Sequence, residues 1–323
     1  MWNYIVRRLL YNIPVYLGII LILMALLRFG AADPAYTFLG KNADPGDLEK
    51  IRHQLGLDKP FFVQYVQFLW EVLTLNFEQE SWGRPGRTVG EMLSTAYIPT
   101  LLITVPGLMI TATISICVGL ISAFNRGRLA DRTLMVLAVV GMSVSFLVYI
   151  IVGQYYGAFQ LKEWVGTEIF AIEGFDLEEN GFIAGWLTYC ALPVIISVIV
   201  AMGYDTRFYR AVMVEESSKD YMVTAKAKGA GRRKVMFVHM LKNAMIPIIT
   251  RVMTTLPFLI VGSVLLEYYF NIPGMGNRLL GAIFDKDFPV IQAFTAIFAV
   301  VFILSNILTD VLYALVDPRV RLQ

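Results

Sequence analysis

Six long apolar stretches constrain this chain more than any other feature of its sequence. A helix needs about 20 mostly apolar residues to cross the hydrocarbon core of a bilayer, because it rises about 1.5 Å per residue. The chain has 323 residues, of which 57% are apolar and only 16% are charged. The stretches that reach the required length are residues 9–27, 98–124, 133–159, 182–204, 247–266 and 288–309. We therefore predict an all-α integral membrane protein with about six transmembrane helices.

The placement of Lys and Arg predicts how the chain is oriented, since cytoplasmic loops of membrane proteins are enriched in basic residues. Residues 160–181 contain six acidic residues and only one lysine, which indicates an external loop. The basic residues gather at Arg7 and Arg8, in residues 125–132, in residues 205–251 and at Arg319 and Arg321. Both termini are thus expected in the cytoplasm.

The predicted topology divides the chain into four parts. These are the N-terminus with the first span (1–29), an extracytoplasmic segment (30–97), the membrane core (98–316) and a cytoplasmic tail (317–323). The first stretch is longer than the roughly 7 to 15 apolar residues of a cleavable signal, so we expect it to be a span. Arg251 is the only charged residue within the six stretches, and it lies close enough to the start of its stretch to reach the headgroups.

The extracytoplasmic segment carries the pattern of two short helices. Asp44, Pro45 and Asp47 are typical of a helix start, and Pro60 opens a second helix. The apolar residues of this second helix recur at helical spacing: Phe62, Tyr65, Val66, Leu69, Val72 and Leu73. This stripe either packs on the membrane bundle or docks an external partner, and both uses are compatible.

The cytoplasmic segment 205–246 has helical patterning rather than loop composition. Ser217, Ser218 or Asp220 is expected to cap a helix that ends at Gly229 and Gly231. On this helix one face is predicted to hold Tyr221, Thr224, Ala225 and Lys228. A second, amphipathic helix under the membrane and leading into Pro247 is predicted to have an apolar face of Phe237, Met240, Leu241, Ala244 and Met245, opposite Arg232, His239, Lys242 and Asn243. Anchoring of Arg232, Arg233 and Lys234 to anionic lipid is the simpler alternative.

The cytoplasmic segment closely resembles the signature of binding-protein-dependent permeases of the dipeptide and oligopeptide importer family. The residues that carry it are Asp220 to Gly229, Arg232, Arg233, Phe237, His239, Asn243 and Pro247. Further matches follow the family's order at Arg7-Arg8-Leu9, Leu55 to Pro60, Gln64-Tyr65, Pro99-Thr100-Leu101, Glu267, Phe270, Pro273 to Gly276, Asp287 to Val290 and Asp317-Pro318-Arg319. The long segment after the first span resembles the first-permease type. Val223-Thr224-Ala225, in place of a Glu-Ala-Ala run, and residues 76–80 depart from the family pattern.

The resemblance implies that the cytoplasmic helix is a coupling helix, seated in a groove of an ATPase subunit. Carried over to this chain, the coupling residues are Asp220, Tyr221, Thr224, Ala225, Lys226, Ala227, Lys228, Gly229, Arg232 and Arg233. The chain has no Gly-x-x-x-x-Gly-Lys-Ser/Thr phosphate loop, so we expect ATP hydrolysis in a partner and no enzymatic activity, catalytic residue, cofactor or metal here.

The resemblance also implies a function and a set of partners. The chain would be the permease subunit of an ATP-driven importer, most consistent with peptides, and would form half of the translocation path in a bacterial inner membrane. Its partners would be two ATP-binding subunits, a second related permease, an extracytoplasmic substrate-binding protein and membrane lipid, with no nucleic acid. Nickel complexes are carried by other members of the family, so the cargo stays open.

Uncharged polar residues in the stretches are candidates for the translocation path: Ser143, Ser145, Gln154, Thr254, Thr255 and Asn306. Each is also explained by ordinary packing between helices. A secondary transporter or a channel subunit without ATP remains the alternative, although the stretches contain no carboxylate for an ion site. An intramembrane protease would need a catalytic constellation in the spans, and His53 and His239 lie outside them. Glu267 and Asp287 either guard the outer mouth, bind a partner or form external salt bridges.

Overall fold

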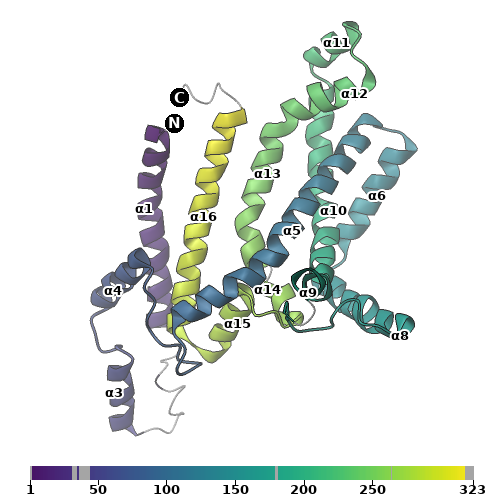
Figure 1. The fold of residues 1–323 in the computed structure, drawn as a ribbon. Coiled ribbons are helices and arrows are strands. Elements are labelled where there is room, and N and C mark those ends of the chain that lie inside the picture. Colours follow the sequence, from purple (N-terminus) through teal and green to yellow (C-terminus); the bar gives the residue numbers. More distant parts are fainter. Residues whose placement is uncertain (1, 31–34, 36–43, 179–180, 263, 317–323) are drawn as a thin grey trace. The chain divides into compact units, whose positions relative to one another are not determined.

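The computed structural model describes residues 2–30, 35, 44–178, 181–262 and 264–316 (Figure 1). Apart from one isolated bridge between Glu80 and Thr88, the residues in these ranges form helices, turns and loops. The predicted all-α fold is therefore confirmed. The cytoplasmic tail 317–323, with Arg319 and Arg321, lies outside the described residues. The chain divides into two compact units, residues 1–98 with 273–307 and residues 99–272 with 308–323.

The first unit is built on helices from both ends of the chain. It holds α1 (Trp2–Ala25) with its π-helical extension η1 (Leu26–Gly30), α3 (Pro45–Gln54), α4 (Phe61–Thr74) and α15 (Met275–Asp285). It also holds the first part of α5 (Val89–Phe124) and most of α16 (Phe288–Val316). Its core joins Ile20 and Met24 of α1, Phe68 and Val72 of α4 and Phe294 of α16. The N-terminal span and the last span thus share one hydrophobic core.

The second unit contains the remaining helices around two hydrophobic cores. After α5 come α6 (Leu129–Ser143), α7 (Phe146–Val152), η2 (Gly153–Gln160), α8 (Leu161–Val165), α9 (Phe182–Tyr189) and α10 (Ala191–Ser217). They are followed by α11 (Asp220–Ala227), α12 (Arg232–Lys234), η3 (Val235–Met240), α13 (Leu241–Gly262) and α14 (Val264–Tyr269). At Gly203 a side chain would lie 2.8 Å from the carbonyl oxygen of Ala138, so glycine lets α10 and α6 approach closely.

The predicted third span, residues 133–159, is bent rather than straight. Its first half ends at Ser143, Val144 is extended, and the following helical segment turns away by 89°. Before the bend, the hydroxyl of Ser143 donates to the carbonyl of Val139. After it, the carbonyl of Ser145 accepts from the amide of Tyr149 in the next helix. Five described helices are long and apolar enough to span a membrane, and counting this bent pair makes six.

The fourth and fifth predicted spans continue into the segment expected to be cytoplasmic. α10 extends to Ser217, beyond the predicted end at residue 204. No break separates α12, η3 and α13, so the expected amphipathic helix under the membrane is the first part of a longer helix that includes the fifth span. Pro247 removes only the hydrogen bond to the carbonyl four residues earlier and does not end this helix.

Candidate functional site

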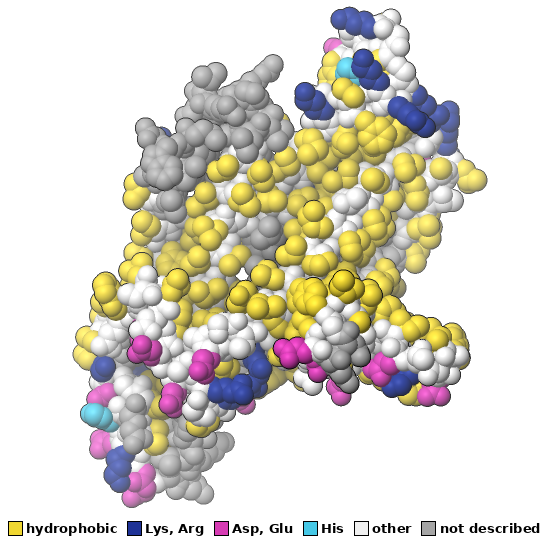
Figure 2. All heavy atoms as spheres, in the orientation of Figure 1, with side chains coloured by type: hydrophobic (Ala, Val, Ile, Leu, Met, Phe, Trp, Pro, Cys, Tyr) yellow, Lys and Arg dark blue, Asp and Glu magenta, His cyan; other side chains and the backbone are white. Residues whose placement is uncertain are grey.

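The residues of the predicted coupling segment meet at one end of the second unit, where α10 ends and α13 begins (Figure 1). Lys and Arg side chains surround this end in Figure 2. Ser217, Ser218 and Asp220 were predicted as possible caps of α11, but Lys219 occupies the N-cap position. Ser217 and Ser218 instead donate hydrogen bonds back to the carbonyls of Val214 and Glu215, which close the last turn of α10.

Glu216 fixes α11 to the end of α10. Its buried carboxylate accepts hydrogen bonds from the ammonium of Lys219 and from the hydroxyl of Tyr221. The bond to Glu216 raises the pKa of Lys219, and burial together with this carboxylate raises the pKa of Tyr221. Both side chains therefore keep their protons at neutral pH, and the hydroxyl of Tyr221 donates its hydrogen bond within this chain. Sequence analysis missed Glu216, because only the fold shows that it points back toward Tyr221.

The two faces of α11 differ in burial. Met222 is buried in a core shared with Leu120 of α5, Met213 of α10 and Met240 of η3, and Ala225 is buried as well. Thr224 and Lys228 are exposed whereas Ala225 is buried, so the prediction that these residues share one face is wrong for Ala225. Val223 is 64% exposed and was not predicted as part of the outer face. The residues of α11 and its C-cap that face outward are Asp220, Val223, Thr224, Lys226, Ala227 and Lys228.

Gly229 ends α11 as predicted. Its φ of +79° is in the left-handed region, which side chains rarely adopt. Its amide donates to the carbonyl of Lys226, and the next amide, of Ala230, donates to Ala225. A Cβ at residue 229 would meet no atom within 4 Å, so a substitution there is strained by its backbone conformation and not by a clash.

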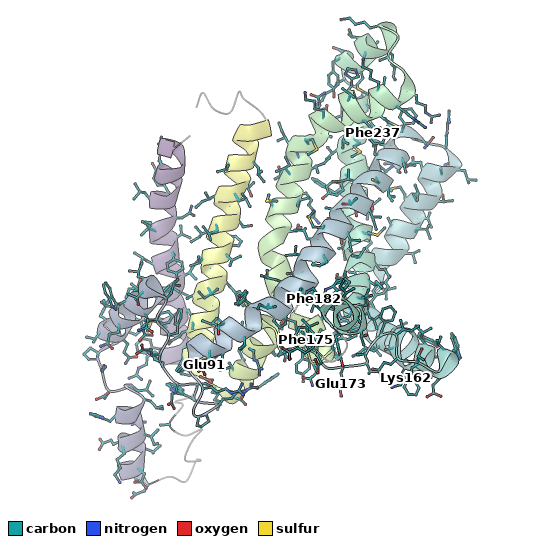
Figure 3. The ribbon with its side chains drawn as sticks, in the orientation of Figure 1. Glu91, Lys162, Glu173, Phe175, Phe182 and Phe237 are labelled. Carbon is teal, nitrogen blue, oxygen red and sulfur yellow. The ribbon has the colours of Figure 1, made fainter. Side chains whose placement is uncertain are left out.

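The helix that follows presents Phe237 outward (Figure 3). Phe237 is 53% exposed, so its predicted place on the apolar face with Met240 and Ala244, both buried, is wrong. The cause is local, because residues 235–240 form a π-helix, whose wider turn breaks the 3.6-residue spacing on which the prediction depended. Val235 is buried in this segment instead. Phe237 and Val238 join the exposed basic residues Arg233 and Lys234 on the outer surface.

Arg232 connects this segment to the end of α5. Its guanidinium donates to the side-chain oxygen of Asn125 at 3.2 Å and lies over the ring of Phe124, 4.2 Å from its centroid. Arg232 and Arg233 are both exposed, and Arg232 makes these contacts within the chain.

A buried ion pair holds the loop that contains Asn125. Arg210 of α10 donates two hydrogen bonds to the carboxylate of Asp131, at 2.6 and 2.8 Å. The same carboxylate accepts from the hydroxyl of Ser122 and from the amide of Gly127. Asp131 is only 3% exposed, so these four bonds compensate for its loss of hydration. Sequence analysis missed the pair, for which the one available signal is a single acidic residue within the basic loop.

A second ion pair joins α10 to α13. The guanidinium of Arg251 donates to Asp205 at 2.9 Å and lies near the ring of Phe208. Arg251 therefore has a partner within the bundle, and its reach to the headgroups stays a prediction. Glu216 thus attaches α11 to α10, while Asp131 and Asp205 attach α10 to α6 and α13.

The two acidic residues considered for the outer surface are both buried. Glu267, in the second unit, has no exposed surface and accepts a hydrogen bond from the hydroxyl of Thr100 at 2.7 Å. Asp287, in the first unit, accepts from the hydroxyl of Ser81 and the amide of Gly83 at the start of α16. Asp287 takes part in no ion pair within the described chain, so the external salt bridge is wrong for it.

Four of the six candidates for the translocation path use their polar groups in hydrogen bonds to backbone carbonyls. Gln154 donates to the carbonyls of Ile172 and Tyr269, which ties η2 to a loop and to the end of α14. The hydroxyls of Ser143, Thr254 and Thr255 donate to carbonyls of their own helices. Ser145 is exposed, as is Asn306 on the part of α16 that belongs to the other unit. Their role in a path stays a prediction.

Comparison with known proteins gives matches along nearly the whole chain. Residues 115–322 match the family described as "Binding-protein-dependent transport system inner membrane component", and residues 1–84 match the N-terminal domain of such components. A probable peptide ABC transporter permease of Sinorhizobium fredii is 33% identical over 318 residues, which are 98% of this chain and 99% of that protein. A glutathione transport system permease of Salmonella choleraesuis is 34% identical over 321 residues, 99% of each chain.

Proposed function

This chain belongs to the family of binding-protein-dependent transport system inner membrane components, and we propose that α11, Gly229 and the outer surface of α12 and η3 couple it to an ATP-binding subunit. The chain is a multi-pass permease subunit of an ABC importer, a system that includes ATP-binding subunits and a substrate-binding protein. Two copies of the ATP-binding subunit, and a second related permease that completes the path, are part of the proposal.

The attachment of α11 is the observation that carries the proposal. A helix that transmits force must be fixed to the spans that it moves, because a loosely held helix would be displaced without moving them. Here Glu216 fixes α11 to α10, and Arg232 connects the following segment to Asn125. No break separates η3 from α13, so three spans are linked to this one surface.

The outer surface has the composition of a docking site. Val223 and Phe237 are large apolar side chains that remain exposed, and basic residues surround them. Apolar anchors within a polar rim are typical of protein interfaces. The residues proposed to contact the ATP-binding subunit are Asp220, Val223, Thr224, Lys226, Ala227, Lys228, Arg233 and Phe237. Tyr221, Ala225 and Arg232 are proposed to support this surface from within the chain.

We propose a peptide as the cargo. The support comes from the relatives, whose names describe a peptide permease and a glutathione permease. Glutathione is itself a tripeptide, so a short peptide is the class of cargo common to both. The substrate-binding protein is proposed to make the selection, and this permease to supply half of the path.

One experiment tests the coupling surface and the cargo together. The tagged chain is purified with its partners, reconstituted in nanodiscs with its binding protein, and assayed for ATP hydrolysis with dipeptides, tripeptides or nickel. We expect Val223→Asp to weaken copurification of the ATP-binding subunit by about tenfold, as for an interface anchor worth 1 to 2 kcal/mol. Peptide should stimulate hydrolysis by the unaltered complex and not by the variant.

Glycine variants provide the matched control. Gly229→Trp and Gly166→Trp place the same bulk at two left-handed residues with open space around them, and residue 166 lies in the predicted external loop. Only Gly229→Trp should release the ATP-binding subunit. Equal loss in both variants would contradict a specific coupling surface. Transport by the purified chain without ATP would contradict the importer as a whole.

A further inference from the structure

Helix α4 in the extracytoplasmic segment has three distinct faces. One face packs in the core of the first unit through Phe68 and Val72. A narrow polar face holds Gln64, Gln67, Glu71 and Thr74. The third face is apolar and exposed, with Trp70 and Leu73 at 68% and 77% exposure, and it consists of Phe62, Val63, Val66, Trp70 and Leu73. A helix that faced water on this side would be expected to show a polar face there.

A hydrogen bond fixes the depth of α4 beside the first span. The hydroxyl of Tyr65 donates to the backbone carbonyl of Leu17 at 2.9 Å. Leu17 is near the middle of the apolar stretch 9–27, ten residues before its end, which corresponds to about 15 Å along a helix. Side chains extend only about 5 to 6 Å from a helix axis. α4 therefore lies alongside the membrane-spanning part of α1, below the outer end of that span.

The residues that surround Tyr65 agree with this depth. Tyr16, one residue before Leu17, donates to the carbonyl of Ala296 in the last span, and α4 shares one hydrophobic core with both of these spans. Residues 61–75 contain a single charged side chain, Glu71. Its carboxylate accepts a hydrogen bond from the amide of Gln79 at 2.7 Å. The one charge of this helix is thus turned away from the exposed apolar face.

The polar face of α4 borders a cavity within the first unit. The cavity has a volume of about 550 Å³, and Gln64 and Gln67 line it together with Arg28, Lys59 and Gln79. The ammonium of Lys59 donates to Gln67 at 3.3 Å, and Gln64 donates to the carbonyl of Lys59. Hydrophilic groups therefore gather on one side of α4, and Leu21 and Ile22 of α1 are apolar residues that are exposed as well.

We propose that α4 is an interfacial helix embedded in the outer leaflet of the membrane, where the face of Phe62, Val63, Val66, Trp70 and Leu73 contacts lipid acyl chains. Amphipathic helices that lie in a bilayer surface divide apolar and polar residues in this way, with tryptophan near the headgroup boundary. The extracytoplasmic segment is then held by lipid as well as by protein, and lipid forms one boundary of the region that contains the cavity. The proposal does not depend on how the chain couples to ATP-binding subunits.

A fluorescence measurement in the assembled importer tests this placement. Cys117 and Cys190 are first replaced by alanine, and single cysteines are introduced as Val66→Cys, Leu73→Cys or the control Gln67→Cys. Each is labelled with an environment-sensitive dye, and the complex is reconstituted in nanodiscs with and without nitroxide-labelled acyl chains. The labels at residues 66 and 73 should lose at least about half of their emission to the lipid nitroxide, and the label at residue 67 should lose much less.

Two other results would overturn the proposal. Blue-shifted emission at residues 66 and 73 that lipid nitroxide does not quench would show that another subunit covers the face. Quenching of these labels by iodide in the buffer, to the same extent as at residue 67, would show that the face is in water. Gln67 is exposed on the same helix, so its label controls for labelling and for local mobility.

Discussion

Helix α11 lies at the ends of membrane spans and α4 lies alongside one, and the two helices are attached to their spans in different ways. α11 and its flanks are held by charged hydrogen bonds, at Glu216 and through the pair of Asp131 and Arg210. α4 is held to its spans by apolar packing, with one neutral hydrogen bond from Tyr65 to Leu17. Its charged hydrogen bonds, at Gln67 and Glu71, are made to Lys59 and Gln79 outside the spans. Charged hydrogen bonds are directional and fix an orientation, whereas apolar contacts depend mainly on the area that they bury. Directional bonds suit α11 to the proposed transmission of movement, and apolar contacts suit α4 to the proposed contact with lipid.

The largest effect is expected when the charged attachment loses one partner. Arg210→Met leaves the carboxylate of Asp131 buried without its counter-ion, which costs about 3 to 5 kcal/mol. Thermal unfolding of the purified chain in nanodiscs measures the loss. Lys162→Met is the control, because its pair with Glu168 is exposed and is worth about 0 to 1 kcal/mol. Equal effects in the two variants would mean that the buried pair does not stabilise this end of the molecule.

A smaller effect is expected from Tyr221→Phe, which keeps the ring and removes only the hydroxyl that donates to Glu216. A hydrogen bond to a charged group contributes about 1.5 to 3 kcal/mol, so the amides of α11 should exchange with solvent roughly tenfold faster or more. Hydrogen-exchange mass spectrometry of the 217–230 segment measures this rate. Unchanged exchange would show that burial of Met222 and Ala225 alone holds the helix.

The smallest effect is expected from Tyr65→Phe, the corresponding change in α4. Its neutral hydrogen bond within the membrane is worth about 0.6 kcal/mol, because interhelical hydrogen bonds in bilayers contribute little on average. Exchange of the amides in residues 61–74 should rise by about threefold or less. A rise as large as that from Tyr221→Phe would remove the contrast between the two attachments and show that the hydroxyl, not packing, holds α4.

The spans were predictable because length and apolar content follow directly from bilayer thickness. The bend at Val144 was not, since an extended valine between two serines leaves no mark on the apolar pattern. The face of Phe237 was predicted wrongly for a related reason, because a π-helical turn changes the spacing without changing the composition. Local sequence thus determined which segments are helices, and tertiary packing determined where they bend.

The helix of the proposed coupling segment was predictable from the sequence, and its contacts were only partly so. Its glycine stop at residue 229 depends on local conformation and is confirmed. The partners of Tyr221 and Arg232 were not predictable, because Glu216 and Asn125 meet them only after the helices have packed. Ala225 was predicted to share a face with Tyr221, Thr224 and Lys228, where a small residue would let another backbone approach, and the structure buries it within the chain.

The bond between Ser81 and Asp287 has a consequence for the order in which the protein is made. These residues are 206 positions apart, and the first unit consists of the first and nearly the last parts of the chain. At about 5 to 20 residues per second, a ribosome needs about 10 to 40 s to advance from one to the other. During that time the early helices are in the membrane without the last span, so their shared hydrophobic core is incomplete. Biogenesis of this unit is thus completed by the last span to be inserted.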